Sequence, residues 1–500
     1  MSESAIEEVA DWHGFAMDYS IEDGAKNILR NRRQSNVNVD AIHDLPVDDS
    51  EMAPAQLYAT ESGRLFHSGK IAIVTVGLPA RGKTHVTVAL TRYLRWLGVK
   101  TRAFHLGDYR RAHLGPGKDV PHDYFHINAS SEAVKLRQTI LQKCRLDLYH
   151  FLDYEKGQVA IYDAVNPLAE GRRQLAKEFA KHDIQTIFIE SYVNDDSIIE
   201  ENVRSVKISS PDYAGWDADK AVAHYIKRIN DKIPHFETIT PAEKDLNYIK
   251  MINAGQRYEV NNCRFGYLPN RIVFYLMNLH IKSRKTYFAR AGISGFDTTY
   301  KADAPLSEQG VAYSERLREA LIKHREDEHS QFLSQGGNAN EIRSLAIWTS
   351  TRVRTVQTAE PLQREGYAVR EKTQLAQLNP GDSEKHTDEE LRKIMPSHWE
   401  EHMLDPYHHR YPRGESYHDL AVRLEPIILE LEREKQDLLI IAHESVLRVL
   451  YGYLMACSTV DIPALMFPRN EIVEIIPESY NNKSRRIKIP NTNAKGEYVP

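Results

Sequence analysis

The chain has 500 residues, of which 41% are hydrophobic and 27% charged, with 25 glycines and 22 prolines spread along it. This composition is typical of a globular protein of about two to four domains, and it excludes collagen-like, coiled-coil and wholly disordered chains. The formal net charge of -5 provides no general attraction for nucleic acid or an anionic membrane, so we expect neither as a partner.

The sequence shows no pattern of a membrane span, a signal peptide or a cysteine motif. No run of apolar residues reaches the ~18 that a membrane span needs. The acidic N-terminal residues lack the basic-then-apolar pattern of a signal peptide, so we expect a cytoplasmic protein. The three cysteines, Cys144, Cys263 and Cys457, are too far apart in sequence to indicate a metal motif or a disulfide framework.

Residues 1–70 show no sustained periodicity, and we expect a flexible tail there. Within it, Arg32-Arg33-Gln34-Ser35 suits a basophilic protein kinase, so Ser35 is a candidate phosphorylation site whose phosphate could pair with the arginines. From residue 71 to about residue 283, apolar runs of strand length alternate with longer helical patterns. The strands are predicted at 71–76, 159–162 and 186–189, and this alternation indicates βαβ units with a parallel sheet.

The strongest motif lies directly after the first of these strands. Residues 77–84 match G-x-x-x-x-G-K-[ST] without a mismatch, and apolar residues at helical spacing follow until Gly98. In such a strand–loop–helix unit, backbone N–H groups wrap the phosphates of a nucleotide, Lys83 bridges the β- and γ-phosphates, and the Thr84 hydroxyl binds Mg²⁺. The candidate ATP-binding loop is Gly77, Leu78, Pro79, Ala80, Arg81, Gly82, Lys83 and Thr84.

An acidic residue ends another strand of this predicted sheet. Asp163 follows Val159-Ala160-Ile161-Tyr162, where it could hold Mg²⁺ or orient an acceptor hydroxyl. The alternative is a strand-end aspartate that caps the next helix. Basic residues near the strand ends then suit a phosphorylated acceptor, although each one alone is more often a solvated surface charge. They are Arg110, Arg111, Arg137, Arg172, Arg173, Lys207 and Arg228.

A second α/β unit begins near residue 284. Strands are predicted at 286–288, 345–348 and 438–442, and a helical segment follows the apolar spacing from Tyr417 to Leu431. We place this domain at 284–477 and expect a loose C-terminal tail from 478 to 500, because that end is polar and lacks an apolar face.

Several of these segments together closely resemble one family. GLPARGKT, LTRYL, GDYRR, FIES, VKISSPDY and RIVFYLMN are similar, in the same order, to the bifunctional 6-phosphofructo-2-kinase/fructose-2,6-bisphosphatase family. The resemblance runs from about residue 71 to about residue 477. It implies an N-terminal P-loop kinase that phosphorylates O2 of fructose 6-phosphate, and a C-terminal histidine-phosphatase domain, like that of phosphoglycerate mutase, that reverses this reaction.

The resemblance also implies roles for single positions. It places Asn202 near ATP, with Mg²⁺ as the cofactor at Thr84 and Asp163, and it makes Lys83, Asp163 and Lys207 the catalytic residues. Fructose 6-phosphate would be bound by Arg110, Arg137, Arg172, Lys207 and Arg228. The family also tends to form dimers, so a homodimer is expected.

Three kinase positions depart from the family pattern. Val165 stands where a threonine hydroxyl is usual, Lys232 stands in place of a tyrosine that binds the sugar phosphate, and Val193 replaces a cysteine. A lost hydrogen bond to a buried partner costs roughly 1–3 kcal/mol. Lys232 could compensate as a new phosphate contact, and we still expect an active kinase.

The second domain lacks its nucleophile. Histidine phosphatases carry Arg-His-Gly-Glu after their first strand, whereas this chain has Arg290-Ala291-Gly292-Ile293, and a methyl group cannot form phosphohistidine. Gln377 stands where the family has its acid and cannot donate a proton as a carboxylic acid does. Arg290, Arg354 and His443 match phosphate-binding positions, and Arg410 lies in a sugar-phosphate loop. We expect no bisphosphatase activity, and either residual ligand binding or a purely structural or dimer-supporting domain.

Two other functions stay open for the whole chain. The first is a P-loop kinase for another metabolite, which Val165 and Lys232 motivate. The second is a non-catalytic sensor of nucleotide and sugar phosphate, against which Lys83, Thr84 and Asp163 argue.

Overall fold

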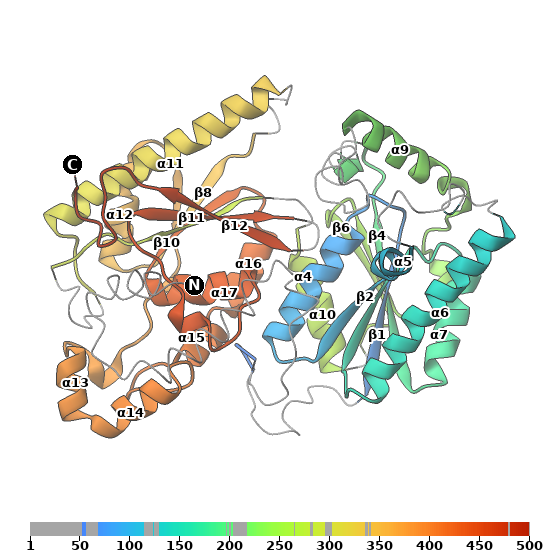
Figure 1. The fold of residues 1–500 in the computed structure, drawn as a ribbon, viewed down its shortest axis with the longest axis horizontal. Coiled ribbons are helices and arrows are strands. Elements are labelled where there is room, and N and C mark those ends of the chain that lie inside the picture. Colours follow the sequence, from blue (N-terminus) through green and yellow to red (C-terminus); the bar gives the residue numbers. More distant parts are fainter. Residues whose placement is uncertain are drawn as a thin grey trace.

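The computed structural model describes residues 53–56, 69–114, 124, 130–196, 198–199, 202–203, 218–264, 266–280, 284–295, 303–335, 339, 342–478 and 481–499. Two α/β domains, each with its own sheet, lie side by side (Figure 1). This is the expected fold class. Ser35 lies outside the described residues. No helix in the described part of the chain is both long enough and apolar enough to cross a membrane.

The first domain is built on a sheet of strand order β2-β3-β1-β4-β5-β6, in which all neighbours are parallel except the antiparallel pair β5 and β6. Its strands are β1 (Lys70–Val76), β2 (Thr101–His105), β3 (Val159–Asp163), β4 (Ile184–Tyr192), β5 (Tyr248–Ile252) and β6 (Arg257–Asn261). The three strands expected from the sequence are confirmed, and β4 is longer than expected. Continuous apolar runs fit these strands because helices cover both faces of the sheet.

Helices α4 and α10 pack on one face of this sheet, and α6 and α7 pack on the other. The helices are α4 (Lys83–Trp96), α5 (Leu106–Leu114), α6 (Ser131–Asp153), α7 (Ala169–Ala180), α9 (Ala218–Asn230) and α10 (Tyr267–Asn278), with the short 3₁₀ helices η2 (Ile233–His235) and η3 (Pro241–Glu243). Gly98, at φ 85°, follows the end of α4 as predicted.

The second domain has the strand order β12-β11-β7-β10-β8-β9, with β7, β10, β8 and β9 parallel and β11 and β12 antiparallel. Its strands are β7 (Thr286–Arg290), β8 (Leu345–Thr349), β9 (Ala368–Glu371), β10 (Asp437–Ala442), β11 (Glu471–Pro477) and β12 (Asn482–Lys488). Its helices are α11 (Glu308–Ser334), α12 (Val353–Arg364), α13 (Asp388–Ile394), α14 (Pro396–Leu404), α15 (Tyr417–Arg423), α16 (Glu425–Arg433) and α17 (Glu444–Leu454), with η5 (Thr373–Leu375), η6 (Gly381–Ser383) and η7 (Ile462–Ala464).

The expected C-terminal tail needs correction, and a short described part of the expected N-terminal tail is held in place. Residues 482–488 are not loose, because they form β12 and pair with β11 over seven residues, and Ile489 behind them is buried. At the other end, Tyr407 donates its hydroxyl hydrogen to the Pro54 carbonyl at 2.8 Å, and the Ala55 N–H donates to the Trp96 carbonyl at 2.9 Å. The described residues 53–56 are therefore held against both domains.

The expected helical segment from Tyr417 to Leu431 is two helices instead of one. Helix α15 ends at Arg423 and α16 begins at Glu425, with Pro426 in its first turn. Proline has no N–H to donate and is favoured at helix starts. The apolar spacing continues across this break, so periodicity alone could not reveal it.

The two domains share one buried core. Helices α4 and α10 of the first domain pack against α16 and α17 of the second (Figure 1). Tyr93 and Tyr275 stack there with ring centroids 4.2 Å apart, and the Tyr93 hydroxyl donates to Glu425 Oε1 at 2.9 Å. Helix α4 begins at the nucleotide loop and also packs against the second domain, so one helix contacts both.

Candidate active site and the second phosphate pocket

The sequence motif at 77–84 forms a loop that connects β1 to the N-terminus of α4. Gly77 has φ 139°, and a Cβ on it would lie 2.7 Å from the Ser191 carbonyl oxygen of β4, so only glycine fits. Gly82 has φ 83° and Ala80 φ 58°. Successive N–H groups in such a turn, together with the helix N-terminus, form an anion-binding concavity.

Two further side chains donate hydrogen bonds to carbonyl groups of the loop. Arg81 is buried and donates from Nη1 to the Pro79 carbonyl at 3.3 Å. The Asn202 amide donates to the Ala80 carbonyl at 3.0 Å. The structure therefore brings Asn202 to the loop, where the resemblance placed it.

Lys83 begins α4 and reaches back to the loop. Its Nζ donates to the Leu78 carbonyl at 2.7 Å. Burial lowers the pKa of Lys83 to about 8, although the Asp163 carboxylate opposes this shift; the positive charges of Lys232 and Arg81 add to it. A phosphate that binds beside this buried ammonium group would stabilise its charged form.

Asp163 ends β3 beside the loop and accepts three side-chain hydrogen bonds. Thr75 Oγ1 donates to Oδ1 at 2.9 Å, and Thr84 Oγ1 and His105 Nδ1 donate to Oδ2 at 3.2 and 2.7 Å. Burial alone would raise the pKa of Asp163, but the His105 hydrogen bond and charge, then the charge of Lys83 and the Thr75 hydroxyl, lower it below its ordinary value. The carboxylate is therefore ionised at neutral pH.

His105 was not predicted as a site residue from the sequence. It ends β2 directly opposite Asp163 in the strand register, so its contact with Asp163 follows from how the two strands pair. The Thr84 hydroxyl and the Asp163 carboxylate face each other, and oxygen donors of this kind suit Mg²⁺. When bound there with ATP, Mg²⁺ would neutralise charge on the phosphates.

The basic residues expected around the acceptor have different surroundings. Arg110, in α5, and Arg137, in α6, both lie close enough to Tyr124 for their charges to counter the burial that raises the pKa of its phenol. Lys207 lies outside the described residues, as does the side chain of Arg228. Lys232 acts electrostatically on Lys83, which places it beside the loop.

Arg172 does not fit the expectation that it binds the sugar phosphate. Its side chain has an exposed fraction of 0%, and Nε and Nη2 donate to the two Glu243 carboxylate oxygens at 2.8 and 2.7 Å. Nη1 donates to the carbonyls of Asn166 and Glu237. This guanidinium ties α7 to the η3 segment, so the structure argues for a structural role.

The structure also describes two of the residues that depart from the family pattern, Val165 and Val193. Val165 follows β3, and its carbonyl accepts the Gly77 N–H at 3.1 Å, so its backbone supports the loop while its side chain has no hydroxyl to offer. Val193 is buried after β4.

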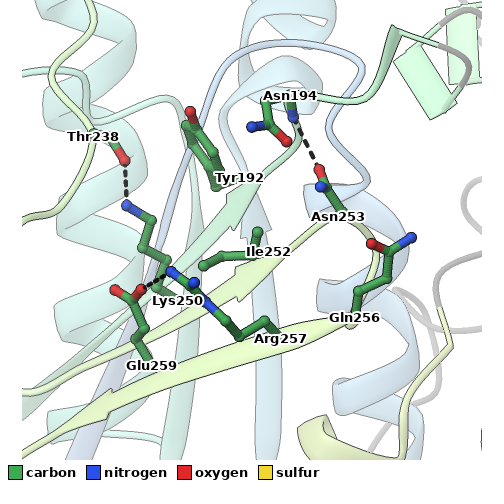
Figure 2. Close-up of a pocket in the computed structure, with 9 residues that line it drawn as sticks. All are labelled: Tyr192, Asn194, Thr238, Lys250, Ile252, Asn253, Gln256, Arg257 and Glu259. Carbon is green, nitrogen blue, oxygen red and sulfur yellow. Dashed lines mark hydrogen bonds and ion pairs between the residues drawn. The ribbon is translucent and has the colours of Figure 1, made fainter.

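A hollow of about 600 Å³ lies at the carboxyl ends of β4 and β5, the same end of the sheet as the loop (Figure 2). Its polar groups pair among themselves: Lys250 Nζ donates to Thr238 Oγ1 at 2.7 Å, and the Asn194 N–H donates to Asn253 Oδ1 at 3.0 Å. The sequence did not indicate this hollow.

The second domain gathers the expected phosphate-pocket residues at the carboxyl ends of β7 and β10. Arg354 Nη2 lies 3.1 Å from His443 Nδ1 and 3.2 Å from Gln377 Oε1. Arg290 Nη1 pairs with Glu444 Oε2 at 2.8 Å. Arg410 is mostly exposed and lies 3.6 Å from Asp419.

His443 has an unusual position in this pocket. An arginine N–H is always the donor, so Nδ1 accepts and the ring proton is on Nε2, which is buried with no hydrogen-bond partner among the described residues. Burial lowers the pKa of His443, and the charges of Arg354 and Arg290 lower it further. The pocket thus holds two arginines and an unused imidazole N–H.

The described part of the pocket has no histidine where the resemblance implies the nucleophile. Ala291 is buried at that position, and Arg469, which was not predicted from the sequence, donates from Nε to the Ala291 carbonyl at 2.6 Å. Ser294 Oγ lies 3.4 Å from Arg354 Nη1, and Gln377 carries an amide where the resemblance implies an acid. The arrangement can attract a phosphoryl group but has no side chain at Ala291 to attack it.

Comparison with known proteins agrees with both halves of this description. Residues 58–283 match the 6-phosphofructo-2-kinase family, and residues 287–490 match branch 1 of the histidine phosphatase superfamily. A Saccharomyces cerevisiae protein provisionally named 6-phosphofructo-2-kinase/fructose-2,6-bisphosphatase is 42% identical over 91% of this chain and 90% of its own length. The human 6-phosphofructo-2-kinase/fructose-2,6-bisphosphatase 1 is 36% identical over 84% of this chain and 85% of its own. With both domains in the same order and over nearly the full length of its relatives, this chain belongs to the 6-phosphofructo-2-kinase/fructose-2,6-bisphosphatase family.

Proposed function

We propose that the first domain transfers the γ-phosphoryl group of ATP to O2 of fructose 6-phosphate, and that the second domain does not hydrolyse the product. The single observation that carries the kinase half is the contact of Thr84 and Asp163 at 3.2 Å beside the buried Lys83. This is the arrangement a P-loop enzyme needs around Mg²⁺ and the β- and γ-phosphates. Family membership supplies the acceptor.

In the proposed reaction, the sugar O2 forms a bond to the γ-phosphorus, the bond to the β–γ bridging oxygen breaks, ADP leaves, and the hydroxyl proton of O2 passes to solvent. Little covalent chemistry is required of the protein, which aligns the two oxygens and neutralises charge. Lys83 would hold the phosphates. The Asp163 carboxylate has a lowered pKa and accepts three hydrogen bonds. It is therefore better suited to hold Mg²⁺ than to take the hydroxyl proton.

The acceptor would be held by Arg110 and Arg137, with Lys232 as a further phosphate contact and Lys207 and Arg228 as contributions implied by the family. Arg172 is left out, because its guanidinium is already engaged. The cytoplasmic location, the homodimer and phosphorylation of Ser35 remain predictions from the sequence.

The test incubates the purified full chain with Mg-ATP and fructose 6-phosphate and measures fructose 2,6-bisphosphate. Lys83→Met and Asp163→Asn should abolish product, whereas Asp245→Asn, at an exposed carboxylate near Arg173, should leave the rate unchanged. A panel of other phosphorylated sugars tests the kinase for another metabolite. Binding of ATP without turnover of any acceptor would favour the non-catalytic sensor and overturn the proposal.

A further inference from the structure

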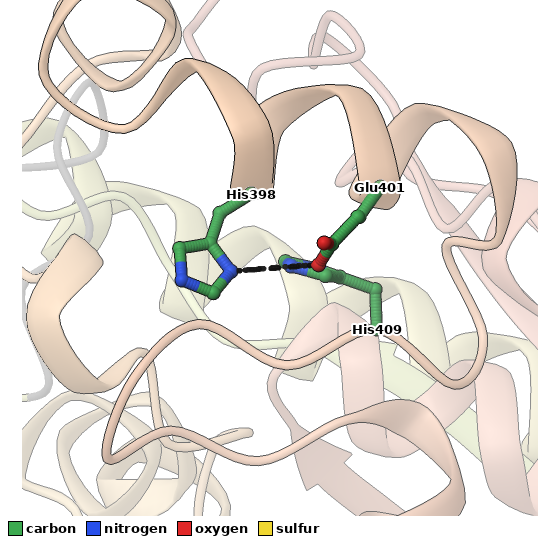
Figure 3. Close-up of side chains that lie close together, drawn as sticks. All are labelled: His398, Glu401 and His409. Carbon is green, nitrogen blue, oxygen red and sulfur yellow. Dashed lines mark hydrogen bonds and ion pairs between the residues drawn. The ribbon is translucent and has the colours of Figure 1, made fainter.

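A group of histidines in the second domain has no part in the function proposed above. His398 and Glu401 lie on α14, and His409 lies on the segment that follows it (Figure 3). His398 Nδ1 lies 3.3 Å from His409 Nε2, and Glu401 Oε2 lies 3.6 Å from the first nitrogen and 3.8 Å from the second. Three ligand atoms of the kind that transition metals prefer thus converge on one point.

The separation of the two nitrogens suits a shared metal ion. Zinc binds imidazole nitrogens at about 2.0–2.1 Å with tetrahedral angles, which places two such nitrogens about 3.3–3.4 Å apart. The observed 3.3 Å matches this separation. The carboxylate oxygen is a few tenths of an ångström farther away, a gap that a rotation of the exposed Glu401 side chain closes.

Local structure explains why the three groups meet. Residues three apart face the same side of a helix, so His398 and Glu401 project together from α14. The chain then turns back at Asp405, whose Oδ1 accepts the N–H groups of Tyr407 and His408 at 3.2 and 3.1 Å, while the His409 N–H donates to the Asp405 carbonyl. This turn presents His409 to the same face of α14.

His409 is the most deeply buried of the three groups. The His409 side chain is only 5% exposed, and its Nδ1 is buried with no hydrogen-bond partner among the described residues, so Nε2 makes its polar contacts. His402, whose ring centroid lies 5.4 Å from that of His409, adds another imidazole nearby.

A second group of similar composition provides a contrast. His324, Glu328 and Glu474 also converge, but Lys285 Nζ lies 2.6 Å from Glu328 and 3.0 Å from Glu474, and Arg485 pairs with both carboxylates. Two protein cations already neutralise that group. Around His398, Glu401 and His409, no lysine or arginine ion pair is found among the described residues, so one metal ion per chain is expected.

We propose that His398, Glu401 and His409 bind one divalent transition-metal ion of the Zn²⁺ class, joining α14 to the segment that carries Arg410. Two imidazoles with one carboxylate suit Zn²⁺ better than Mg²⁺ or Ca²⁺, which prefer oxygen-only ligands. Three protein ligands leave a fourth position for water or for a ligand of the second domain.

The test titrates Zn²⁺ into the full chain, prepared without a histidine tag and stripped with a chelator, by isothermal calorimetry. The wild type should bind one ion. His409→Ala and Glu401→Gln should weaken binding at least tenfold; Glu401 is 64% exposed, so its substitution leaves the fold intact. The matched control is His386→Ala, because His386 lies 3.7 Å from Glu390 in an exposed pair without a third ligand.

A second readout reports geometry. Co²⁺ added in place of Zn²⁺ should give the intense visible absorption of a four-coordinate site in the wild type and in His386→Ala, and lose it in His409→Ala. Absence of stoichiometric Zn²⁺ binding, or an affinity that His409→Ala leaves unchanged, would overturn the proposal. Circular dichroism of each variant distinguishes loss of ligand from loss of fold.

Discussion

Arg92 and Glu432 form a buried ion pair between the two domains, with Nη2 and Oε1 2.7 Å apart and each side chain only 8% exposed. Arg92 lies on α4, the helix that begins at the nucleotide loop, and Glu432 lies on α16. The Tyr453 hydroxyl donates to the same Glu432 oxygen at 2.6 Å, and the Arg92 guanidinium lies 5.1 Å from the centre of the Tyr453 ring. The pair thus anchors the kinase helix to the second domain through a small polar cluster.

Arg92→Met should therefore destabilise the protein by about 3–5 kcal/mol, because it leaves the Glu432 carboxylate buried without its cation. Chemical denaturation followed by tryptophan fluorescence measures this. Arg364→Met, which removes an exposed pair with Glu315, is the control and should cost less than about 1 kcal/mol. Adding Glu432→Leu to Arg92→Met should restore much of the loss; a double variant as unstable as the sum of the singles would contradict this account.

Arg172 provides a test of structural against substrate-binding roles. Arg172→Lys cannot reproduce the two parallel hydrogen bonds to Glu243, and Glu243→Gln removes the charge from the other side of the pair. Both should lower the melting temperature by several degrees, in line with a cost of about 3 kcal/mol for a buried pair. Below their melting temperatures, both should retain the wild-type KM for fructose 6-phosphate. A KM raised tenfold by Arg172→Lys but not by Glu243→Gln would instead support a sugar-phosphate contact.

Binding of Mg-ATP should take up protons above neutral pH. Burial lowers the pKa of Lys83 to about 8 in the free protein, and contact with phosphate raises the pKa again because the charged form is favoured. Above pH 8 the free protein has lost much of this charge, so binding must recover a proton and affinity should fall as pH rises. Calorimetry in buffers of different ionisation enthalpy should find uptake approaching one proton at pH 8.5 and little at pH 6.5. Equal uptake at both values would exclude Lys83 as the source.

The second domain should regain phosphoryl chemistry in two steps. Ala291→His restores the attacking nitrogen beside Arg290, Arg354 and His443, so incubation with fructose 2,6-bisphosphate labelled at the 2-phosphate should trap phosphohistidine. The leaving oxygen still needs a proton, and Gln377→Glu supplies a carboxyl group within reach of Arg354. The double variant should release phosphate at least tenfold faster than Ala291→His alone.

The control for this prediction is the same double variant with His443→Ala, which removes the unpartnered imidazole N–H and should lower turnover again. Measurable hydrolysis by the unmodified chain, above an Arg290→Ala, His443→Ala background, would show that the present pocket is active and would contradict the proposed loss of bisphosphatase activity.

Features that are contiguous in the chain could be predicted without the tertiary structure. The nucleotide loop at 77–84 is one segment between a strand and a helix, and its glycines adopt the backbone angles that the motif implies. The predicted loss of the nucleophile rests on one position, Ala291, in a short motif. Buried strands could also be predicted, because a strand covered on both faces is a continuous apolar run in the sequence.

Only the tertiary structure decided which distant side chains meet. The hydrogen bond of His105 to Asp163 depends on the register of β2 against β3, and the burial of Arg172 depends on Glu243, 71 residues away. The tail expected from residue 478 became a strand because β11 offers an edge to pair with, whatever the polarity of the segment. His398, Glu401 and His409 read in sequence as scattered polar residues. The turn after α14 brings them together. Binding depends on the distances between the ligand atoms, and the path of the backbone sets these distances, whereas the residue types alone do not.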